Sequence, residues 1–334
     1  MKHLRVTGGP PAASAGRSSA SAGPGAASAG QLPASDLARR FVSLSRLPHV
    51  LLDLATPAFA AILWLGRFPS AHTMLLGLAT AFAGYTAVYA LNDLVDRQLD
   101  REKMSTDDTA RRGYLDAIAG RHPVARGLLT RAQGWAWMLA WQVLAVVGAF
   151  FLRPSCVIIF LAGGALEALY CRLYRVTPLR VFLSGLVKTL GGVAAVFAVD
   201  PAPDPARLLA LVLLVFFWEM GGQNIPADWT DIDEDTGMRA RTVPVILGAR
   251  RATVAILACM AAAIGLSLVV LAVFRGPDAL LFMAFAALAG AGLLLYPAAR
   301  LLRTGERAGA QRLFNLASWY PLALLAIIAA RAVV

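Results

Sequence analysis

Two acidic runs in the chain have a spacing that would place carboxylates together on one face of a helix. In the first, NDLVDRQLD, Asn92, Asp96 and Asp100 recur every four residues, with Asp93 close to the same stripe. Side chains at this interval lie one above the other, so their oxygens converge and their like charges repel. Such a cluster requires a cation. Hard oxygen ligands suit Mg²⁺, which is commonly held by one or two carboxylates together with substrate phosphates.

The second run, NIPADWTDIDED, repeats the same spacings further along the chain. Asn224, Asp228, Asp231 and Asp235 form another single helical stripe, although Pro226 is expected to distort its first turn. One acidic run alone is typical of a solvated loop. Two matching runs favour two facing carboxylate clusters that clamp a diphosphate through Mg²⁺. The predicted metal ligands are Asn92, Asp96, Asp100, Asp228, Asp231 and Asp235.

Other sites that such sequences could form are not supported. DIDEDT resembles the start of a calcium loop, but the positions that require Gly and Glu hold Thr236 and Thr242. The chain has no GxxxxGK[ST] phosphate-binding motif. Its three cysteines are widely spaced and are predicted to be small core residues. The histidines are predicted to form no ligand cluster: His3, His49, His72 and His122.

Basic residues near the acidic runs are candidates for binding the diphosphate. The turn YCRLYRVTPLR supplies Arg172, Arg175 and Arg180, and a guanidinium can bind two phosphate oxygens at once. The alternative, that these arginines simply flank a membrane span, is equally compatible with the sequence. The same two interpretations apply to Arg239 in RARTVP. The candidate diphosphate-binding residues are Asn92, Arg172, Arg175, Lys188 and Arg239.

Ionisable residues inside apolar segments form a third group of candidates. Intramembrane charges usually face a bundle interior or a polar cavity. Lys188 either contacts phosphate or offsets an acid, and Asp53 either orients a second substrate, together with Arg46, or is a structural partner. Glu167 is predicted to be partly solvated or paired with an arginine.

Nine apolar stretches must position these residues. A hydrocarbon core requires about 20 consecutive apolar residues, and a chain with 58% apolar and 15% charged residues is typical of a polytopic membrane protein. The acidic runs follow the second and sixth stretches. The predicted fold is therefore an all-α bundle of about nine transmembrane helices. The stretches are 47–65, 71–91, 132–152, 154–171, 181–199, 207–225, 252–273, 277–298 and 314–333.

The net charge of +11 is explained by membrane topology rather than by a nucleic-acid partner. Of the 31 Lys and Arg residues, 25 fall on one side of the predicted bundle and 5 on the other, and Lys188 lies within a span. Basic loops face the cytoplasm. We therefore predict an integral, multi-pass protein in the lipid bilayer, with the N-terminus and both acidic runs on the cytoplasmic side.

The chain begins with a segment that lacks the hydrophobicity to fold. Residues 1–45 are rich in Ala, Gly, Ser and Pro and contain no apolar region of a signal peptide. They are predicted to be a disordered cytoplasmic tail, and residues 46–334 to be one transmembrane domain.

Together the two runs resemble the signatures of the UbiA superfamily of intramembrane prenyltransferases. NDLVDRQLD is similar to its N-D-x-x-D-x-x-x-D motif, and DWTDIDEDTGMRARTVPVILG to its second aspartate-rich region, with Thr242 and Gly248 in register. The resemblance covers roughly residues 40–334. The chain departs from the family in a longer connection at 101–120, interpreted as a modified cap, and in Arg239, where a glycine is common.

This resemblance implies a bundle whose central cavity opens to the cytoplasm and the bilayer, and a Mg²⁺-dependent enzyme. Metal ions and basic residues would stabilise the departing diphosphate of an isoprenyl diphosphate, and an apolar pocket would protect the allylic cation from water. An aromatic or other lipophilic acceptor would then attack the cation. The implied catalytic residues are Asp96, Asp100, Asp231 and Asp235.

Two other functions are compatible with parts of the sequence. One shares the ionisation of the diphosphate, and the other involves no ionisation. A terpene cyclase on the same scaffold needs the same carboxylates but no acceptor, because a double bond of the substrate captures the cation. An ion transporter would place its carboxylates near the middle of the spans. The acidic runs lie at the ends of spans, and only Asp53 and Lys188 are in the position that transport requires.

Overall fold

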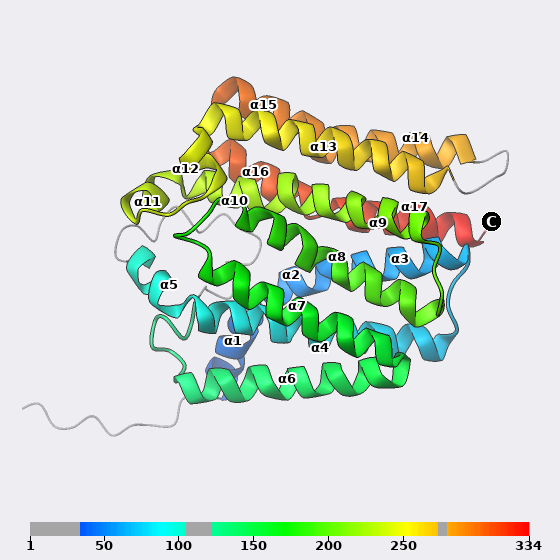
Figure 1. Cartoon of the computed structure of the whole chain (residues 1–334), viewed down its shortest axis with the longest axis horizontal. Helices are drawn as coiled ribbons and strands as arrows, with labels where there is room; N and C mark the ends of the chain where they lie inside the picture. The colour runs from blue at the N-terminus through cyan, green and yellow to red at the C-terminus, as the bar shows by residue number, and fades with distance from the viewer. Residues whose placement is uncertain (1–33, 105–121, 273–278, 334) are drawn as a thin grey trace, which may run out of the picture.

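In the part of the chain that the structure describes, nine long apolar helical segments lie side by side and cross the molecule in alternating directions (Figure 1). The computed structural model describes residues 34–104, 122–272 and 279–333. Within these residues every predicted span is present, with ends that differ by a few residues. The spans are α2 (Leu47–Asp53) with α3 (Ala55–Leu65), α4 (Ala71–Val95), α6 (Arg131–Leu152), α7 (Pro154–Arg172), α8 (Arg180–Val199), α9 (Pro205–Trp218) with η2 (Glu219–Asn224) and α10 (Ile225–Thr230), α13 (Ala249–Leu271), α14 (Ala279–Gly290) with η3 (Ala291–Leu295) and α15 (Tyr296–Thr304), and α16 (Arg307–Ala317) with α17 (Tyr320–Val333).

Helices suit this chain because every backbone polar group in a lipid-exposed span must be satisfied within the segment. Polar caps mark where spans begin. The Ser70 hydroxyl accepts a bond from the Thr73 N–H at the start of α4, and Thr130 and Gln133 form a capping box at the start of α6. Gly66 ends α3 in a left-handed conformation that costs glycine little.

Shorter helices gather at one end of the bundle, on the left in Figure 1. They carry or adjoin both acidic runs, so the chemistry-bearing residues lie at one end of the spans. The predicted cap over 101–120 falls mostly on residues 105–121, outside the described residues. The short helices are α1 (Ala34–Leu44), α5 (Arg97–Met104), α11 (Ile232–Gly237) and α12 (Val243–Leu247).

The predicted boundary of the disordered tail at residue 45 is wrong, because α1 is a helix. Leu37, Phe41 and Leu44 share one face of α1 and pack against α4 and α6, where Phe41 stacks on Trp137 at 4.6 Å between ring centroids. This apolar stripe follows the low-complexity sequence directly, so composition averaged over residues 1–45 conceals it. Residues 1–33 lie outside the described residues.

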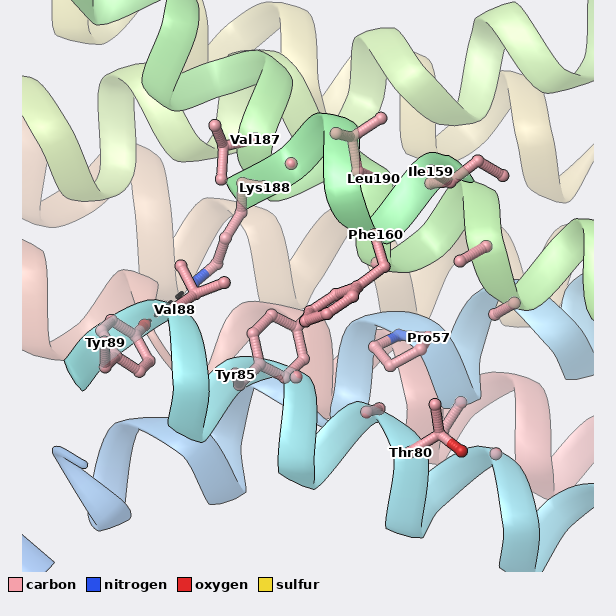
Figure 2. A pocket seen from close by; sticks show the side chains of 18 of the residues that line it. Pro57, Thr80, Tyr85, Val88, Tyr89, Ile159, Phe160, Val187, Lys188 and Leu190 are labelled. Carbon is pink, nitrogen blue, oxygen red and sulfur yellow. Dashed lines mark hydrogen bonds between the residues drawn. The ribbon is translucent and has the colours of Figure 1, made fainter. Parts of the chain in front are cut away.

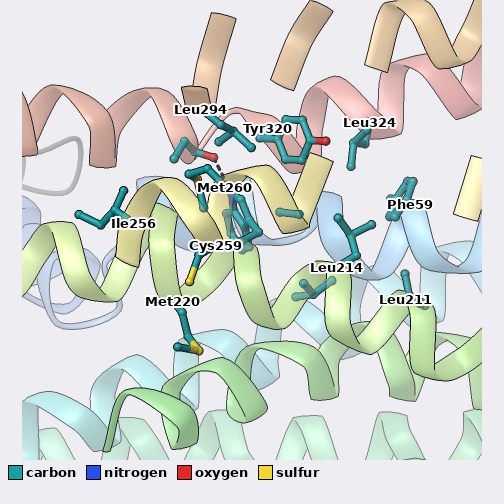
Figure 3. Close-up of a cluster of buried hydrophobic side chains, with 14 of the residues drawn as sticks. Phe59, Leu211, Leu214, Met220, Ile256, Cys259, Met260, Leu294, Tyr320 and Leu324 are labelled. Carbon is teal, nitrogen blue, oxygen red and sulfur yellow. Dashed lines mark hydrogen bonds between the residues drawn. The ribbon is translucent and has the colours of Figure 1, made fainter. Parts of the chain in front are cut away.

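The largest packed core lies between α3, α9, α13 and α17 and contains side chains such as Phe59, Leu214, Met260 and Tyr320 (Figure 3). Backbones approach closely here. A Cβ added to Gly221 would lie 2.5 Å from the Cβ of Cys259. All three cysteines are buried and unbridged, as predicted.

The span that carries the second acidic run contains a π-helical turn, η2, that ends two residues before Pro226. Proline lacks an N–H and its ring crowds the carbonyl four residues earlier. The wider turn accommodates this, and the Ile225 N–H bonds to the Met220 carbonyl five residues back. The distortion expected from Pro226 therefore occurs just before it, and π-helical turns are frequent at functional sites.

Candidate active site

The first acidic run forms the end of α4 and the start of α5. The Asp96 N–H bonds to the Asn92 carbonyl at 2.9 Å, and the Asp100 N–H bonds to the Asp96 carbonyl at 2.8 Å. Helical bonding thus continues through the junction, although Asp96 itself has a non-helical ψ of 3°. Asn92, Asp96 and Asp100 keep the single stripe that their spacing predicts.

The second run is built in the same way across α10 and α11. Asp231 lies between the two helices with a ψ of 12°, and the Asp235 N–H bonds to its carbonyl at 2.8 Å. Each run therefore bends at its middle aspartate. Asp235 is completely buried and accepts a hydrogen bond from the Tyr174 hydroxyl.

Lys103 of α5 reaches from the first acidic run into the second. Its Nζ lies 3.3 Å from Asp231 Oδ2 and 3.0 Å from Asp235 Oδ1, above the ring of Tyr174. Burial would lower the pKa of Lys103, but the two carboxylates outweigh burial and raise it, so the ammonium stays charged. Sequence reasoning missed this residue. Its position three residues after Asp100, on the same helical face, was the available signal.

Arg180 is the arginine of the Tyr170–Arg180 turn that the structure buries. Its Nη2 donates to Asp228 Oδ1 at 2.7 Å. The guanidinium lies over the rings of Tyr170 and Tyr174, at 4.6 and 4.8 Å from their centroids. Two aromatic faces and a carboxylate fix its plane.

The other predicted phosphate-binding arginines do not join this cluster. Arg172 and Arg239 are exposed, and Arg175 is directed to Glu102 and to the Met238 carbonyl. None of the three lines the cavity described below. Arg172 and Arg175 lie at and just after the end of α7, and Arg239 follows α11. All three side chains are exposed, as expected for arginines that flank a membrane span.

His122 forms a buried cluster with Asp93 and Asp100 that the sequence analysis did not anticipate. Its Nδ1 lies 2.8 Å from Asp93 Oδ1 and 2.7 Å from Asp100 Oδ2. Burial would lower the pKa of His122, but both carboxylates raise it above its ordinary value. The imidazole contacts both carboxylates and so orients Asp100. The sequence analysis did not anticipate this contact, because 22 residues separate His122 from Asp100 in the chain.

Asn92 is held on both sides of its amide. Its Nδ2 donates to Glu167 Oε1 at 2.7 Å, and its Oδ1 accepts a bond from Arg46 Nη2 at 3.1 Å. Glu167 is 9% exposed. The prediction of a partly solvated or arginine-paired Glu167 is therefore wrong, because α4 and α7 pack so that its carboxylate meets Asn92.

Lys188 and Asp53 form a buried pair. Lys188 Nζ lies 2.6 Å from Asp53 Oδ2, which also accepts a bond from the Tyr89 hydroxyl at 2.5 Å. Asp53 is 3% exposed and does not line the cavity, whereas Lys188 and Tyr89 do. In the structure Asp53 therefore holds Lys188 and Tyr89 at the cavity wall.

A cavity of about 380 Å³ runs from the acidic end into the bundle. Its polar end is lined by Arg46, Asn92, Asp231 and Lys188, and its remaining length is largely apolar. Figure 2 shows Lys188 and Tyr89 near one another, with the rings of Tyr85 and Phe160 further along. This volume is within the range of about 300–1,000 Å³ of small-molecule sites.

The oxygens of both runs suit a hard divalent cation. Asp235 Oδ2 and Asn224 Oδ1 are buried and have no hydrogen-bond partner among the described residues. Burial, and then the neighbouring Asp100, raise the pKa of Asp96 to about 6. Burial alone would raise the pKa of Asp100 too, but His122 and other cations lower it. A site with oxygen donors only and excess negative charge fits Mg²⁺ in preference to softer metals.

The fold and this site define an integral membrane helical bundle that has an acidic centre at one end of a largely apolar cavity. The chain belongs to the UbiA prenyltransferase family, whose sequence model matches residues 54–320. It is therefore an intramembrane prenyltransferase, and the resemblance inferred from the two acidic runs is confirmed.

Curated relatives and solved structures agree with this assignment. The digeranylgeranylglyceryl phosphate synthases of Thermococcus kodakarensis and Pyrococcus abyssi are each 22% identical over 64% of this chain and 71% of their own length. A UbiA homologue from Aeropyrum pernix K1 superimposes with a TM-score of 0.68 at 22% identity, over 84% of this chain and 96% of the homologue. A UbiA homologue from Archaeoglobus fulgidus, solved bound to DMAPP and Mg²⁺, has a TM-score of 0.62 at 16% identity, over 86% and 99%.

Proposed function

We propose that this chain transfers the prenyl group of an isoprenyl diphosphate to an aromatic or other lipophilic acceptor, with Mg²⁺ as cofactor. One observation carries the proposal. Two matching acidic runs are joined by Lys103, and Asn92, Asn224 and Asp231 of these runs line the polar end of a long, largely apolar cavity. A diphosphate with an apolar tail has the same polarity pattern as this cavity.

Six residues would hold the metal, and all of them would bind it through side-chain oxygen atoms. When bound, Mg²⁺ neutralises diphosphate charge and stabilises it as a leaving group. The structure of an Archaeoglobus fulgidus homologue with DMAPP and Mg²⁺ supports the choice of metal and substrate class. The residues are Asn92, Asp96, Asp100, Asp228, Asp231 and Asp235.

Lys103 and Arg180 are the basic residues best placed to bind phosphate oxygens. Arg180 is buried and Lys103 is largely buried, both contact the second acidic run, and both can exchange a carboxylate partner for a phosphate oxygen. As the C–O bond breaks, the electron pair leaves with the diphosphate. Fixed cations there stabilise the developing negative charge without reorganising. We retain Lys188 as a further candidate, because its Nζ lies at the cavity wall.

The cavity wall beyond the acidic end would protect the allylic cation. Its side chains exclude water, and the faces of Tyr85 and Tyr89 are electron-rich surfaces for a positive carbon. The acceptor forms the new bond to the cation and then loses a proton.

Arg46 and the pair of Asp53 with Lys188 are the proposed acceptor-orienting groups. Arg46 lines the cavity beside Asn92, and Asp53 acts through Lys188 and Tyr89. The Thermococcus and Pyrococcus relatives are named for a glyceryl phosphate product, so lipid alcohols belong beside aromatic rings among the acceptors to be tested.

We place the acidic end on the cytoplasmic side. The asymmetry of Lys and Arg supports this orientation, because 25 of the 31 fall on the side that carries both acidic runs.

Mass spectrometry of products tests the proposal. Purified protein would receive prenyl diphosphates of several lengths, Mg²⁺, and either an aromatic acid, a quinol, a glyceryl phosphate lipid or no acceptor. A prenylated acceptor, formed only with Mg²⁺, is expected. A cyclic terpene formed without acceptor would replace the transferase proposal with the cyclase alternative. Absence of any Mg²⁺-dependent product would contradict both.

A further inference from the structure

The apolar cavity continues well past the point where a short prenyl chain would end. Along α4 its lining extends from Asn92 through Tyr85 and Gly77 to Thr73. A helix rises about 1.5 Å per residue, so roughly 28 Å separates Asn92 from Thr73. Each isoprene unit adds four C–C bonds of about 1.5 Å, or roughly 5 Å of extended chain.

Two aromatic rings divide this length. Figure 2 shows Tyr85 of α4 and Phe160 of α7 with their rings pointing toward one another in the cavity. Tyr85 lies seven residues from Asn92, roughly 10 Å along the helix. Two isoprene units therefore reach the rings, and further units must pass them.

Glycines set the position of both rings. A Cβ on Gly191 would lie 2.2 Å from the Tyr85 hydroxyl, and a Cβ on Gly84 would lie 3.2 Å from Phe160 Cε2. Because these two positions are glycines, the rings can lie against the helix backbones. A larger residue at either position would push its ring toward the passage. The Tyr85 hydroxyl is buried and has no hydrogen-bond partner among the described residues, so hydrogen bonding does not fix that ring.

Beyond the rings the cavity is largely apolar, and its wall combines small side chains with larger ones such as Met74, Leu78 and Leu152. The hydroxyl of Thr80 in this part bonds to the Leu76 carbonyl of its own helix. A Cβ on Gly77 would meet no atom within 4 Å. Lining residues of this part are Pro57, Ala61, Gly77, Ala81, Cys156 and Ala194.

We infer that the cavity beyond Tyr85 and Phe160 holds the third and fourth isoprene units of the prenyl diphosphate, and that this chain selects a donor of four units over one of two. The inference rests on the proposed function, since it assumes that the diphosphate binds at the acidic end. A four-unit chain of roughly 20 Å would extend about 10 Å past the rings, into the space beside Gly77 and Ala81.

Binding of two-unit and four-unit prenyl diphosphates, measured by calorimetry with Mg²⁺ in one detergent, tests the inference. Wild-type protein should bind the four-unit chain on the order of tenfold more tightly, because more apolar surface is buried. Ala81→Phe fills the far space and should abolish that preference, while the two-unit Kd stays within about threefold. Ala79→Phe, on the exposed side of the same helix, should behave as wild type.

A second pair of variants tests the two rings. Gly191→Ala forces the Tyr85 hydroxyl into the passage and should weaken four-unit binding selectively. Adding Tyr85→Phe removes the clashing oxygen and should restore it. An unchanged ratio of the two Kd values in Ala81→Phe, or in Gly191→Ala, overturns the inference. Failure of wild-type protein to bind either diphosphate would instead contradict the proposed function.

Discussion

At the scale of single residues, the site is governed by how buried carboxylates are compensated. Asp228 faces Arg180, Asp235 faces Lys103, and Asp100 faces His122, each within 3.0 Å. A buried charge without a partner is costly, so each of these carboxylates depends on the cation that faces it. In the described structure each of these acids is paired with a cation of the protein. When substrate binds, a metal ion can take the place of that cation beside the acid, and a phosphate can take the place of the acid beside the cation.

Substitution of a motif aspartate should abolish transfer without unfolding the protein. Asp96→Asn and Asp231→Asn each remove one negative oxygen ligand, and we expect at least a 100-fold loss of Mg²⁺-dependent product formation, about 2.7 kcal/mol or more. Asp233→Asn, an exposed position in the same run, is the matched control and should keep its activity. Substantial turnover in both motif variants would contradict the proposed clamp.

Removal of Lys103 should make stability depend on Mg²⁺. Lys103→Met leaves Asp231 and Asp235 without their ammonium, and loss of one partner of a buried pair costs about 3–5 kcal/mol. We expect a lower melting temperature in EDTA that rises again when Mg²⁺ is added. Arg303→Met, an exposed cation on α15, should show neither effect. A Lys103→Met protein that melts like wild type in EDTA would show that the pair is not stabilising.

At the scale of elements, two bent helical junctions and one π-helical turn aim the carboxylates. Asp96 separates α4 from α5, and Asp231 separates α10 from α11. The turn η2 lies against α13, where Gly221 allows the backbones to approach. Because packed elements transmit strain, a change here shifts the second acidic run without touching it.

Enlarging Gly221 should therefore impair both stability and activity. Its added Cβ would lie 2.5 Å from Cys259 Cβ and 3.1 Å from the Ile256 carbonyl oxygen, which belongs to backbone and cannot rotate away. Gly221→Ala should destabilise the protein by about 1–3 kcal/mol, measured by thermal melting, and lower turnover. Gly265→Ala lies within α13 with no atom near its added Cβ, and should be neutral or stabilising. Equal melting of the two variants would refute the packing argument.

At the scale of the whole molecule, the short helices and both acidic runs share one end of the nine spans found among the described residues (Figure 1). The links at residues 66–70 and 200–204 lie at the other end. The proposed orientation places the first end in the cytoplasm. The three native cysteines are buried, so introduced cysteines can report the two sides separately.

Labelling of intact cells with a membrane-impermeant thiol reagent should distinguish the two ends. In a cysteine-free background, Arg67→Cys should react from outside, because Arg67 is exposed at the end opposite the acidic runs. Glu306→Cys, exposed between α15 and α16, should react only after permeabilisation. The reverse pattern would invert the proposed topology.

The sequence by itself determined the spans and the two acidic runs. Membrane length and hydropathy are local properties, and Asn92, Asp96 and Asp100 need only a continuous helix to share a face. The family resemblance rested on these same local patterns. The predicted end of the disordered tail at residue 45 was wrong because composition was averaged over a long window. That average concealed α1, which begins at Ala34.

Only the tertiary structure decided which side chains complete the site. Arg172, Arg175 and Arg180 are indistinguishable in sequence, yet packing of α8 against the second acidic run buries Arg180 alone among them. Lys103 meets Asp231 across 128 residues of chain. Such contacts depend on how helices pack and how their ends bend, and a single sequence carries no local signal for either. The acids were predictable because they lie on one helix face, and their cations were not because those come from other helices.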